Sequence, residues 1–453
     1  MTTGVLRRCI PFMGVLLSCP ALADEQSSAA GFLEGSHLQL LNRTYYLNRD
    51  LRNGASNSLG ANAHKPVSAR SGYREELAQG AMFFYQSGYT QGTLGVGADL
   101  HALFGLRLDG GGGRTGTSLM PWGNDGPPTD YSKGGAALKL RFSKTQLMYG
   151  EQFPLTPVFG FNDSRLLPGS ATGLSLRSNE LRNIELQAGH FTATSGPESS
   201  NHDGELNTNL MQLPGSRSVD YLGGTYAPSK NLSLSLYTSR LADIWWQHYA
   251  GAKYRYPWAP GRLISMDANL YSTHDTGASK GGPIDNLTGS LMLGLTWKAH
   301  KVSVGYQKVD GDEPMDWVSL DGTLGNVALA NIMQVSHFTE PNETSWQLRY
   351  DLDLASFAVP GLTFMVRYTR GAGASNSHSD NVFYTQQGKH VYDDDKDNKH
   401  WERDIEIGYV VQSGAAKNLA LRVKQSVHRS TSGGRYPDHD ETRLIAEYPI
   451  DIF

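Results

Sequence analysis

Short segments in which hydrophobic and polar residues alternate recur along most of the chain. In one of them Leu232, Leu234 and Leu236 lie on one face, while two serines and Tyr237 lie on the other. The same pattern returns in the segments 291–297, 302–306, 346–352, 405–412 and 444–452. Alternation with a period of two predicts β-strands that have one apolar and one polar face. We count about eighteen such segments of about ten residues, which lies within the range of bacterial outer-membrane barrels.

The connections between these segments alternate between short turns and long polar loops. The short turns lie near residues 143–144, 228–230, 299–300, 359–361 and 415–417. The long loops cover about 50–77, 109–132, 151–171, 193–218, 274–286, 311–342, 371–400 and 430–440, and only the connection near 240–242 is short where a long one is expected. A soluble β-sandwich also alternates, but the asymmetry of the connections favours a barrel with long outer loops and short periplasmic turns. We therefore predict an all-β, transmembrane, antiparallel β-barrel.

The N-terminal segment predicts export. Arg7 and Arg8 precede an apolar stretch, and 21–23 offers a small-residue cleavage site, which together are typical of a signal peptide over residues 1–23. Lipoprotein processing at Cys19 is the alternative. Both cysteines of the chain, Cys9 and Cys19, lie in this segment, so the mature protein is expected to have neither a disulfide nor a thiol site. Residues 24–453 are predicted to form one barrel domain.

Composition agrees with a barrel and narrows the choice of partners. The chain contains 51 glycines, 22 tyrosines and 8 tryptophans, and its mean hydropathy is −0.41. After the signal peptide no apolar stretch approaches the roughly 18 residues that a spanning helix needs, and a closed barrel is the other way to satisfy a backbone in lipid. The formal net charge of −4 favours no nucleic-acid partner.

Basic residues lie on the polar faces of several predicted strands. In the segment 419–428, Arg422, Lys424 and His428 alternate with Leu421 and Val423, so they are expected to face the lumen. An arginine that faced lipid near the membrane midplane would cost roughly 2–4 kcal/mol. The same parity places further basic residues in the lumen, namely Arg43, Arg49, Lys139, Arg141 and Arg367.

Such a row of cations suits the passage of anions. Guanidinium groups donate two parallel hydrogen bonds to a carboxylate, and several weak sites in succession allow binding without trapping. The alternative interpretation is that these residues pair with inward acids such as Asp351, Glu406 and Glu447 and merely fill a closed lumen.

Ordered motifs along the mature chain resemble the OprD-type specific porins. They lie at 31–34, 41–50, 144–145, 149–152, 157–159, 164–168, 171–173, 306–312, 359–365, 421–425, 428–429 and 443–449. This resemblance implies an eighteen-stranded barrel whose third loop, here Glu151–Ala171, folds inward as a constriction, with Asp163 and Arg165 as candidate constriction residues. It also implies a basic ladder, which maps to Arg43, Arg49, Arg367, Arg422 and Lys424.

One departure from the family pattern bears on the substrate. Family members usually have arginine where this chain has Lys424, and lysine offers a point charge instead of a planar fork. This substitution and the short connection near 240–242 leave the substrate subclass open.

Enzyme and metal motifs are weak. The segment 277–281 matches G-x-S-x-G, but it lies in a polar loop without the strand and helix that a nucleophile elbow requires. The glycine-rich segment 110–116 lacks the lysine of a P-loop. The acidic run 393–398 could gather a cation but lacks the glycine and glutamate of an EF-hand loop. We expect no catalytic residue, no metal site and no cofactor.

The sequence thus predicts a substrate-selective diffusion channel for small carboxylate-bearing nutrients, either amino acids or aromatic and organic acids. The alternatives are a serine-type barrel hydrolase using Ser426 and His428, or an adhesin that acts through its loops. Expected partners are small anionic or zwitterionic carboxylates, outer-membrane lipid and lipopolysaccharide, and the barrel assembly machinery. Phe453 resembles the C-terminal aromatic signal that this machinery reads. The expected location is the outer membrane of a Gram-negative bacterium, as a monomer or loose trimer.

Overall fold

The structure is a computed structural model that describes residues 26–122, 126–211, 215–320, 325–385, 392, 398–431 and 437–453. The predicted signal peptide, with Cys9 and Cys19, and most of the acidic run at 393–398 lie outside the described residues. None of the helices in the described ranges has the length and apolar character needed to cross a membrane.

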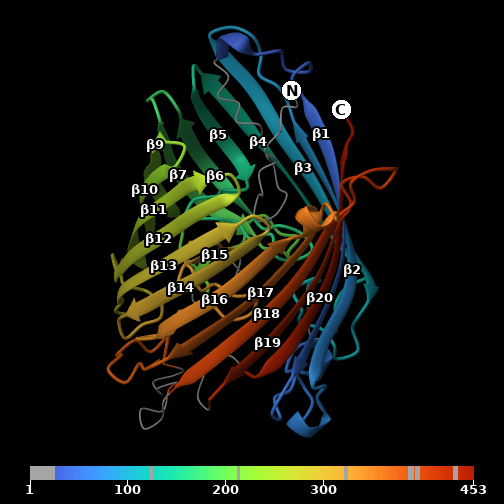
Figure 1. The fold of residues 1–453 in the computed structure, drawn as a ribbon, viewed down its shortest axis with the longest axis vertical. Helices are drawn as coiled ribbons and strands as arrows, with labels where there is room; N and C mark the ends of the chain where they lie inside the picture. The colour runs from blue at the N-terminus through green and yellow to red at the C-terminus, as the bar shows by residue number, and fades with distance from the viewer. Residues whose placement is uncertain are drawn as a thin grey trace.

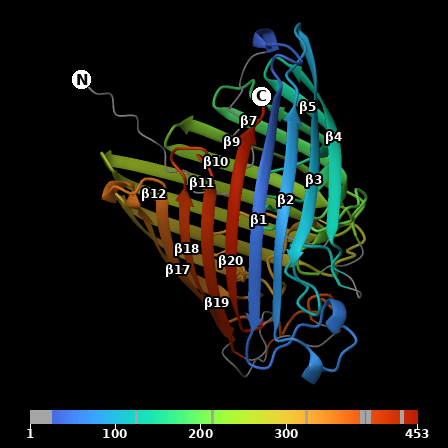
Figure 2. The ribbon, with the colours of Figure 1, turned by 90° about the vertical axis from the view of Figure 1, so that its right-hand side faces the viewer.

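Eighteen antiparallel strands form one closed sheet, because β1 pairs with both β2 and β20 (Figures 1 and 2). The prediction of an eighteen-stranded antiparallel barrel is confirmed. The barrel strands are β1(His37–Leu51), β2(Tyr73–Gln86), β3(Leu94–Asp109), β4(Asp130–Phe142), β5(Thr145–Gln152), β6(Ser170–Ser178), β7(Ile184–Ser195), β9(Val219–Ser229), β10(Leu232–Leu241), β11(Trp245–Ala259), β12(Arg262–Asp275), β13(Asp285–Trp297), β14(His300–Asp310), β16(Thr344–Asp353), β17(Leu362–Ala372), β18(Lys399–Val410), β19(Ala420–Ser430) and β20(His439–Asp451).

The alternation of the sequence becomes an alternation of faces. On β19, Leu421 and Val423 are 42% and 47% exposed on the outer surface, whereas Ser426 and His428 are fully buried. The outer surface carries leucine, valine and aromatic side chains on most strands, as a hydrocarbon environment requires. The polar partners of each strand lie inside, where they form a hydrophilic interior.

Short connections lie at one end of the barrel and long loops at the other, except that the predicted short connection near 240–242 joins β10 to β11 at the long-loop end. A two-residue turn at Pro260 and Gly261 joins β11 to β12, and Gly261 has a φ of +69°, which glycine adopts without steric cost. The start of β1 lies beside the end of the chain, where Leu38 N donates to Phe453 O at 3.0 Å. The short turns, the start of β1 and the end of β20 therefore lie at this end of the barrel, as Figure 2 shows for the two strands.

Several of the long loops pack inward in the part of the chain that the structure describes. The β5–β6 loop does so, as predicted for the third loop, and the β7–β9 and β14–β16 loops join it, which sequence reasoning missed. The latter two each contribute a short strand, β8(Leu206–Thr208) and β15(Val318–Leu320), and these pair as a separate two-stranded sheet.

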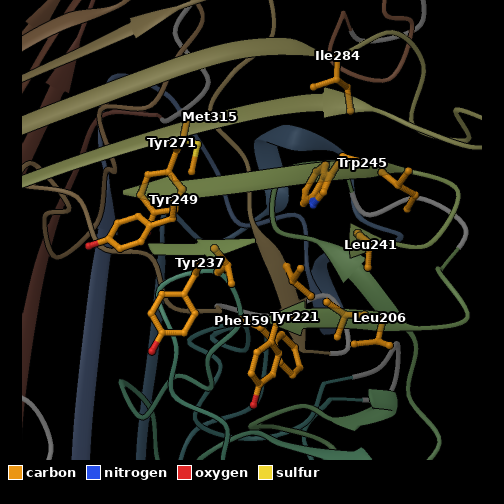
Figure 3. Close-up of a cluster of buried hydrophobic side chains, with 14 of the residues drawn as sticks. Phe159, Leu206, Tyr221, Tyr237, Leu241, Trp245, Tyr249, Tyr271, Ile284 and Met315 are labelled. Atoms are coloured by element: carbon orange, nitrogen blue, oxygen red, sulfur yellow. The ribbon is translucent and has the colours of Figure 1, made fainter. Parts of the chain in front are cut away.

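A hydrophobic cluster fixes these loops against one side of the interior. Phe159, Leu206 and Met315 come from the three loops, and they pack with inward-facing wall residues such as Trp245 and Tyr271 (Figure 3). All of these side chains are buried. This cluster therefore holds a part of each of the three loops against the wall of β7 to β14.

Candidate functional site

The β5–β6 loop is attached to opposite sides of the barrel interior. Near its start, Tyr271 Oη donates to Pro157 O at 2.8 Å, and Phe159 packs in the cluster of Figure 3. Near its end, Leu166 and Leu167 pack in a second buried cluster with residues of β1 to β4. The loop thus crosses the lumen as a fixed bridge.

Arg43 of β1 is the polar anchor of this bridge. Its Nη1 and Nη2 atoms donate to the two carboxylate oxygens of Asp163, each at 2.7 Å. Nη1 also donates to the backbone oxygen of Arg165 at 2.7 Å, and Nε donates to Glu447 at 2.7 Å. With only 2% of Arg43 exposed, the guanidinium is saturated by loop and wall groups. Both predicted constriction residues therefore lie where the loop meets β1.

A small cavity of about 60 Å³ opens beside this anchor, at the wall formed by β1, β19 and β20. Four basic side chains line it, against two carboxylates. The lining residues are Arg43, Tyr45, Asp163, Ser164, Arg422, Lys424, Arg443, Ile445 and Glu447. The cations of the lining exceed its anions by two, while Glu406 and Glu441, which pair with Lys424 and Arg443, are not among the lining residues.

Arg422 and Lys424 form ion pairs and still face the cavity. Arg422 Nη2 contacts Glu447 Oε2, and Lys424 Nζ lies 2.9 Å from Glu406 Oε2. Their side chains are 13% and 23% exposed, in contrast to the fully enclosed Arg43. The alternative interpretation was correct that these bases meet inward acids. Both side chains nevertheless line the cavity, so the lumen is not completely filled at this point.

Arg49 and Arg443 share the carboxylate of Glu441, each at 2.5 Å. Arg443 also donates to Gln334 O of the β14–β16 loop at 3.0 Å. Sequence reasoning did not select Arg443 or Glu441 as site residues. Their alternation with Leu444 on the last strand was the available signal.

Arg367 holds a loop. It pairs with Asp404 at 2.7 Å, and its Nη1 donates to Ile332 O at 3.1 Å. Gln334 N, two residues further along the same loop, donates to Asp404 at 3.2 Å. Arg367 therefore positions the β14–β16 loop against β17 and β18, and it does not line the cavity.

Lys139 and Arg141 lie at the end of the barrel that carries the short turns. Lys139 Nζ contacts Asp99 at 2.5 Å and Ser87 O at 2.8 Å. Arg141 Nε donates to Gln26 at 2.8 Å, and its guanidinium lies 4.0 Å from the centre of the Tyr89 ring. They attach the N-terminal segment and the first turn to the wall, away from the cavity.

His428 is buried at the opposite end. Its ring lies 3.1 Å from Nδ1 of His400, and its centre is 5.6 Å from that of His439. Across the described residues, no group of three or more potential ligands is placed to hold a metal ion. Ser426 and His428, the pair considered for hydrolysis, are both fully buried, so neither is presented to a solute. The G-x-S-x-G segment lies in the β12–β13 loop, as expected from its polarity.

Charged groups of the inward loops have shifted pKa values. Burial lowers the pKa of the Arg165 guanidinium to about 10, and the nearby Arg443 acts in the same direction. Burial also raises the pKa of the Asp163 carboxyl, although Arg43 opposes the change. In the β7–β9 loop, burial raises the pKa of Glu198 to about 7 against the opposing effect of Arg165. Glu198 therefore titrates near neutral pH inside the barrel.

Comparisons with known proteins agree with this architecture. Residues 30–452 match the model of the outer membrane porin, OprD family. The chain is 43% identical to Porin D of Pseudomonas aeruginosa over 95% of this chain and 94% of the relative. It is 32% identical to the porin-like protein GalP of Pseudomonas putida over the full length of both.

Solved structures of relatives superpose over nearly the whole chain. The crystal structure of Pseudomonas aeruginosa OprD has a TM-score of 0.80 at 40% identity and covers 95% of this chain and 98% of that one. Pseudomonas aeruginosa OpdK, solved with vanillate, has a TM-score of 0.80 at 33% identity and covers 93% and 100%. A closed barrel with inward loops, matched in sequence and in structure, identifies the chain as a member of the OprD family of outer-membrane porins.

Proposed function

We propose that this porin passes small carboxylate-bearing nutrients and selects them through lumen cations at the β1, β19 and β20 wall. The observation that carries the proposal is the cavity beside the β5–β6 loop, where four basic side chains face two carboxylates. An anionic solute that reaches this point meets a lining in which cations outnumber carboxylates, in a confined space where charge interactions are stronger than in bulk water.

Arg422 and Lys424 are the groups that we assign to the solute. Each already holds a wall carboxylate, Glu447 or Glu406, so a passing carboxylate exchanges with an existing partner. Exchange of this kind gives weak, successive sites, which a channel needs because a deep site would retain the solute. Arg43 is enclosed by the loop and acts as the anchor of the bridge.

Lys424 adds a preference within this class. An ammonium group binds one carboxylate oxygen as a point charge, whereas a guanidinium binds two in a plane. The site of this chain therefore combines one planar donor, Arg422, with one flexible donor. OpdK was crystallised with vanillate, an aromatic carboxylate, which agrees in chemistry with the class proposed here.

The test is uptake by a cell that lacks its own general porins and expresses this chain. Aromatic, aliphatic and amino-acid carboxylates are compared with their neutral amides at equal concentration. We expect faster entry of the carboxylates, and a loss of this advantage in Arg422→Gln. The matched control is Arg349→Gln, because Arg349 is a lumen cation on β16 that pairs with Asp351 at 2.6 Å and does not line the cavity. Equal entry of acids and amides would contradict the proposal.

A further inference from the structure

A second group of cations lies on the outer surface of the barrel, at the loop ends of β17, β18 and β19. We call it the outer basic patch, and it consists of Arg370, Lys399, Arg403 and Arg429. On β18 the outward positions Trp401, Arg403 and Ile407 alternate with the buried Glu402 and Asp404. The parity that places acids in the lumen therefore places these cations on the lipid side.

Strand register brings the patch together with a belt of aromatic rings. Arg370 is the partner of Trp401, and Tyr368 is the partner of Arg403, so the two arginines lie diagonally across β17 and β18. They are two residues apart along the strands, or about 7 Å. The Tyr368 ring lies 5.8 Å from Trp401 and 5.6 Å from Trp346. Aromatic rings in such a belt mark the boundary between hydrocarbon and headgroups.

Most side chains on the membrane side of this belt are apolar. Val366 and Ile405 occupy the next outward positions on β17 and β18 toward the short-turn end. On β19 that position is Gln425, which accepts from Arg403, and Val423 follows it with 47% of its side chain exposed. The arginines therefore stand at the edge of the hydrocarbon layer. A guanidinium at this level reaches toward the headgroups with its stem on apolar surface.

Two of these arginines have no carboxylate partner among the residues that the structure describes. Arg403 donates to Gln425 Oε1 at 2.8 Å, while its Nε is buried and has no hydrogen-bond partner in the described part of the chain. For Arg370, we find neither an ion pair nor a hydrogen bond within the same ranges. Arg429, by contrast, pairs with Asp440 at 2.8 Å.

Several other outward cations on this rim meet an acidic side chain. Arg52 pairs with Asp50 and Asp440, Arg114 pairs with Glu75 and Asp109, and His190 contacts Asp220. Within the described ranges Arg240 on β10 also has no carboxylate partner, but it stands alone over the Trp246 ring at 5.9 Å, whereas β17 and β18 bring two such arginines together. The position of this pair at the outer rim, level with the headgroups of the outer leaflet, indicates an anionic lipid as its counterpart.

We propose that the outer basic patch binds the phosphate groups of the anionic glycolipid that forms the outer leaflet. The guanidinium group of arginine matches phosphate oxygens in geometry and charge. Arg370 and Arg403 offer two such groups at two levels along the strands. The rings of Trp401 and Tyr368 lie between them, where a sugar can pack. The apolar strands beneath receive the acyl chains. This site is on the lipid face and does not depend on the solute chosen by the lumen.

The test compares glycolipid binding by the purified barrel in detergent, read by native mass spectrometry. The probes are bisphosphorylated lipid A and the same lipid after removal of its phosphates. We expect the unaltered barrel to bind the phosphorylated form about tenfold more tightly or better, and the double variant Arg370→Gln, Arg403→Gln to lose that preference.

The matched control is Arg262→Gln. Arg262 also faces outward and lies 3.8 Å from the Trp297 ring centre, but it belongs to the opposite rim, so its replacement should leave binding unchanged. Resistance of the folded barrel to detergent at room temperature and an unaltered single-channel conductance show that the double variant is intact. Equal binding of both lipids by the unaltered barrel would overturn the proposal. So would a double variant that changes only the oligomeric mass, because the patch would then join two copies of the chain.

Discussion

Arg43 and Asp163 meet as a two-pronged ion pair, with both Nη to Oδ distances at 2.7 Å, and this contact ties the loop that crosses the lumen to the first strand of the barrel. The same guanidinium holds Glu447 and two loop carbonyls. The inward parity of Arg43 predicted a ligand for the substrate, but Arg43 instead anchors the loop. The cations that remain accessible are its neighbours on β19.

The first prediction concerns this anchor. Arg43→Ala leaves Asp163 buried without its partner, and loss of one member of a buried pair costs about 3–5 kcal/mol. We expect the free energy of unfolding in lipid vesicles to fall by about that amount, and the open-channel current to become larger and noisier. Arg43→Lys keeps the charge but loses the fork, so it should give an intermediate result. A quiet channel of normal conductance in Arg43→Ala would show that the loop is held in another way.

A second prediction concerns Tyr271, which joins two loops. Its hydroxyl donates to Pro157 O at 2.8 Å and accepts from Ala328 N at 2.9 Å. Tyr271→Phe leaves both loop groups without this partner, which costs about 1–3 kcal/mol. We expect rapid current fluctuations in single-channel recordings. Tyr249→Phe is the control, because Tyr249 Oη donates to Asn269 of the wall at 2.7 Å and has no hydrogen bond to a loop in the described ranges. The same noise in both variants would refute a specific role for Tyr271.

Arg367 should act through the β14–β16 loop. Arg367→Gln removes the donor to Ile332 O, so solute selectivity should change together with loop noise. Arg349→Gln removes a cation on the neighbouring strand that is in register with Arg367 but does not hold this loop. If the two variants behave alike in solute-blocking experiments, Arg367 contributes only its charge.

The lumen charge should change near neutral pH through Glu198. Its pKa is raised to about 7, so the carboxyl is mainly neutral at pH 6 and mainly ionised at pH 8. Ionisation adds a negative charge beside Arg165 and weakens the attraction for anions. Carboxylate uptake into liposomes should therefore fall as the pH rises between these values. Glu198→Gln should flatten this dependence, and an unchanged slope in that variant would assign the titration to another group.

The barrel could be predicted from the sequence because hydrocarbon outside and water inside impose a strict alternation of apolar and polar residues along each strand. Leu421 and Val423 face outward, as the alternation required. The short polar segments between alternating stretches marked the turns, and the strands of the structure end at them. The inward third loop came from family resemblance. The pairing of β8 with β15 was not visible, because three-residue strands inside a loop carry no periodic signal.

Site residues were predicted less completely than strands. Parity identifies which cations face inward, but it does not show how far along the lumen each lies or what it contacts. Lys139 and Arg141 therefore proved to hold the N-terminal end, and Arg367 a loop. Arg443 was missed, although it lines the cavity. The roles of Arg422 and Lys424 in substrate passage stay predictions, as do the assembly partners, the oligomeric state and the signal peptide.

Lys424 offers a gain of function. Lys424→Arg replaces a point charge with a fork beside the cavity, so a carboxylate should reside about two- to tenfold longer. Glu406, its present partner at 2.9 Å, remains available to pair with the new guanidinium. The dwell time of benzoate block in single-channel traces measures the change. A shorter dwell time would indicate that Glu406 captures the arginine and withdraws it from the lumen.

The central claim is that the cations of β19 recognise the carboxylate of a passing solute. Its most direct test is single-channel block by benzoate and by benzamide, which have similar size and differ in charge, on the unaltered porin and on the double variant Arg422→Gln, Lys424→Gln. We predict that benzoate interrupts the current of the unaltered channel more often and for longer than benzamide, and that the difference disappears in the variant. Equal block by both solutes in the unaltered channel, or a benzoate preference that survives in the folded variant, would contradict the account.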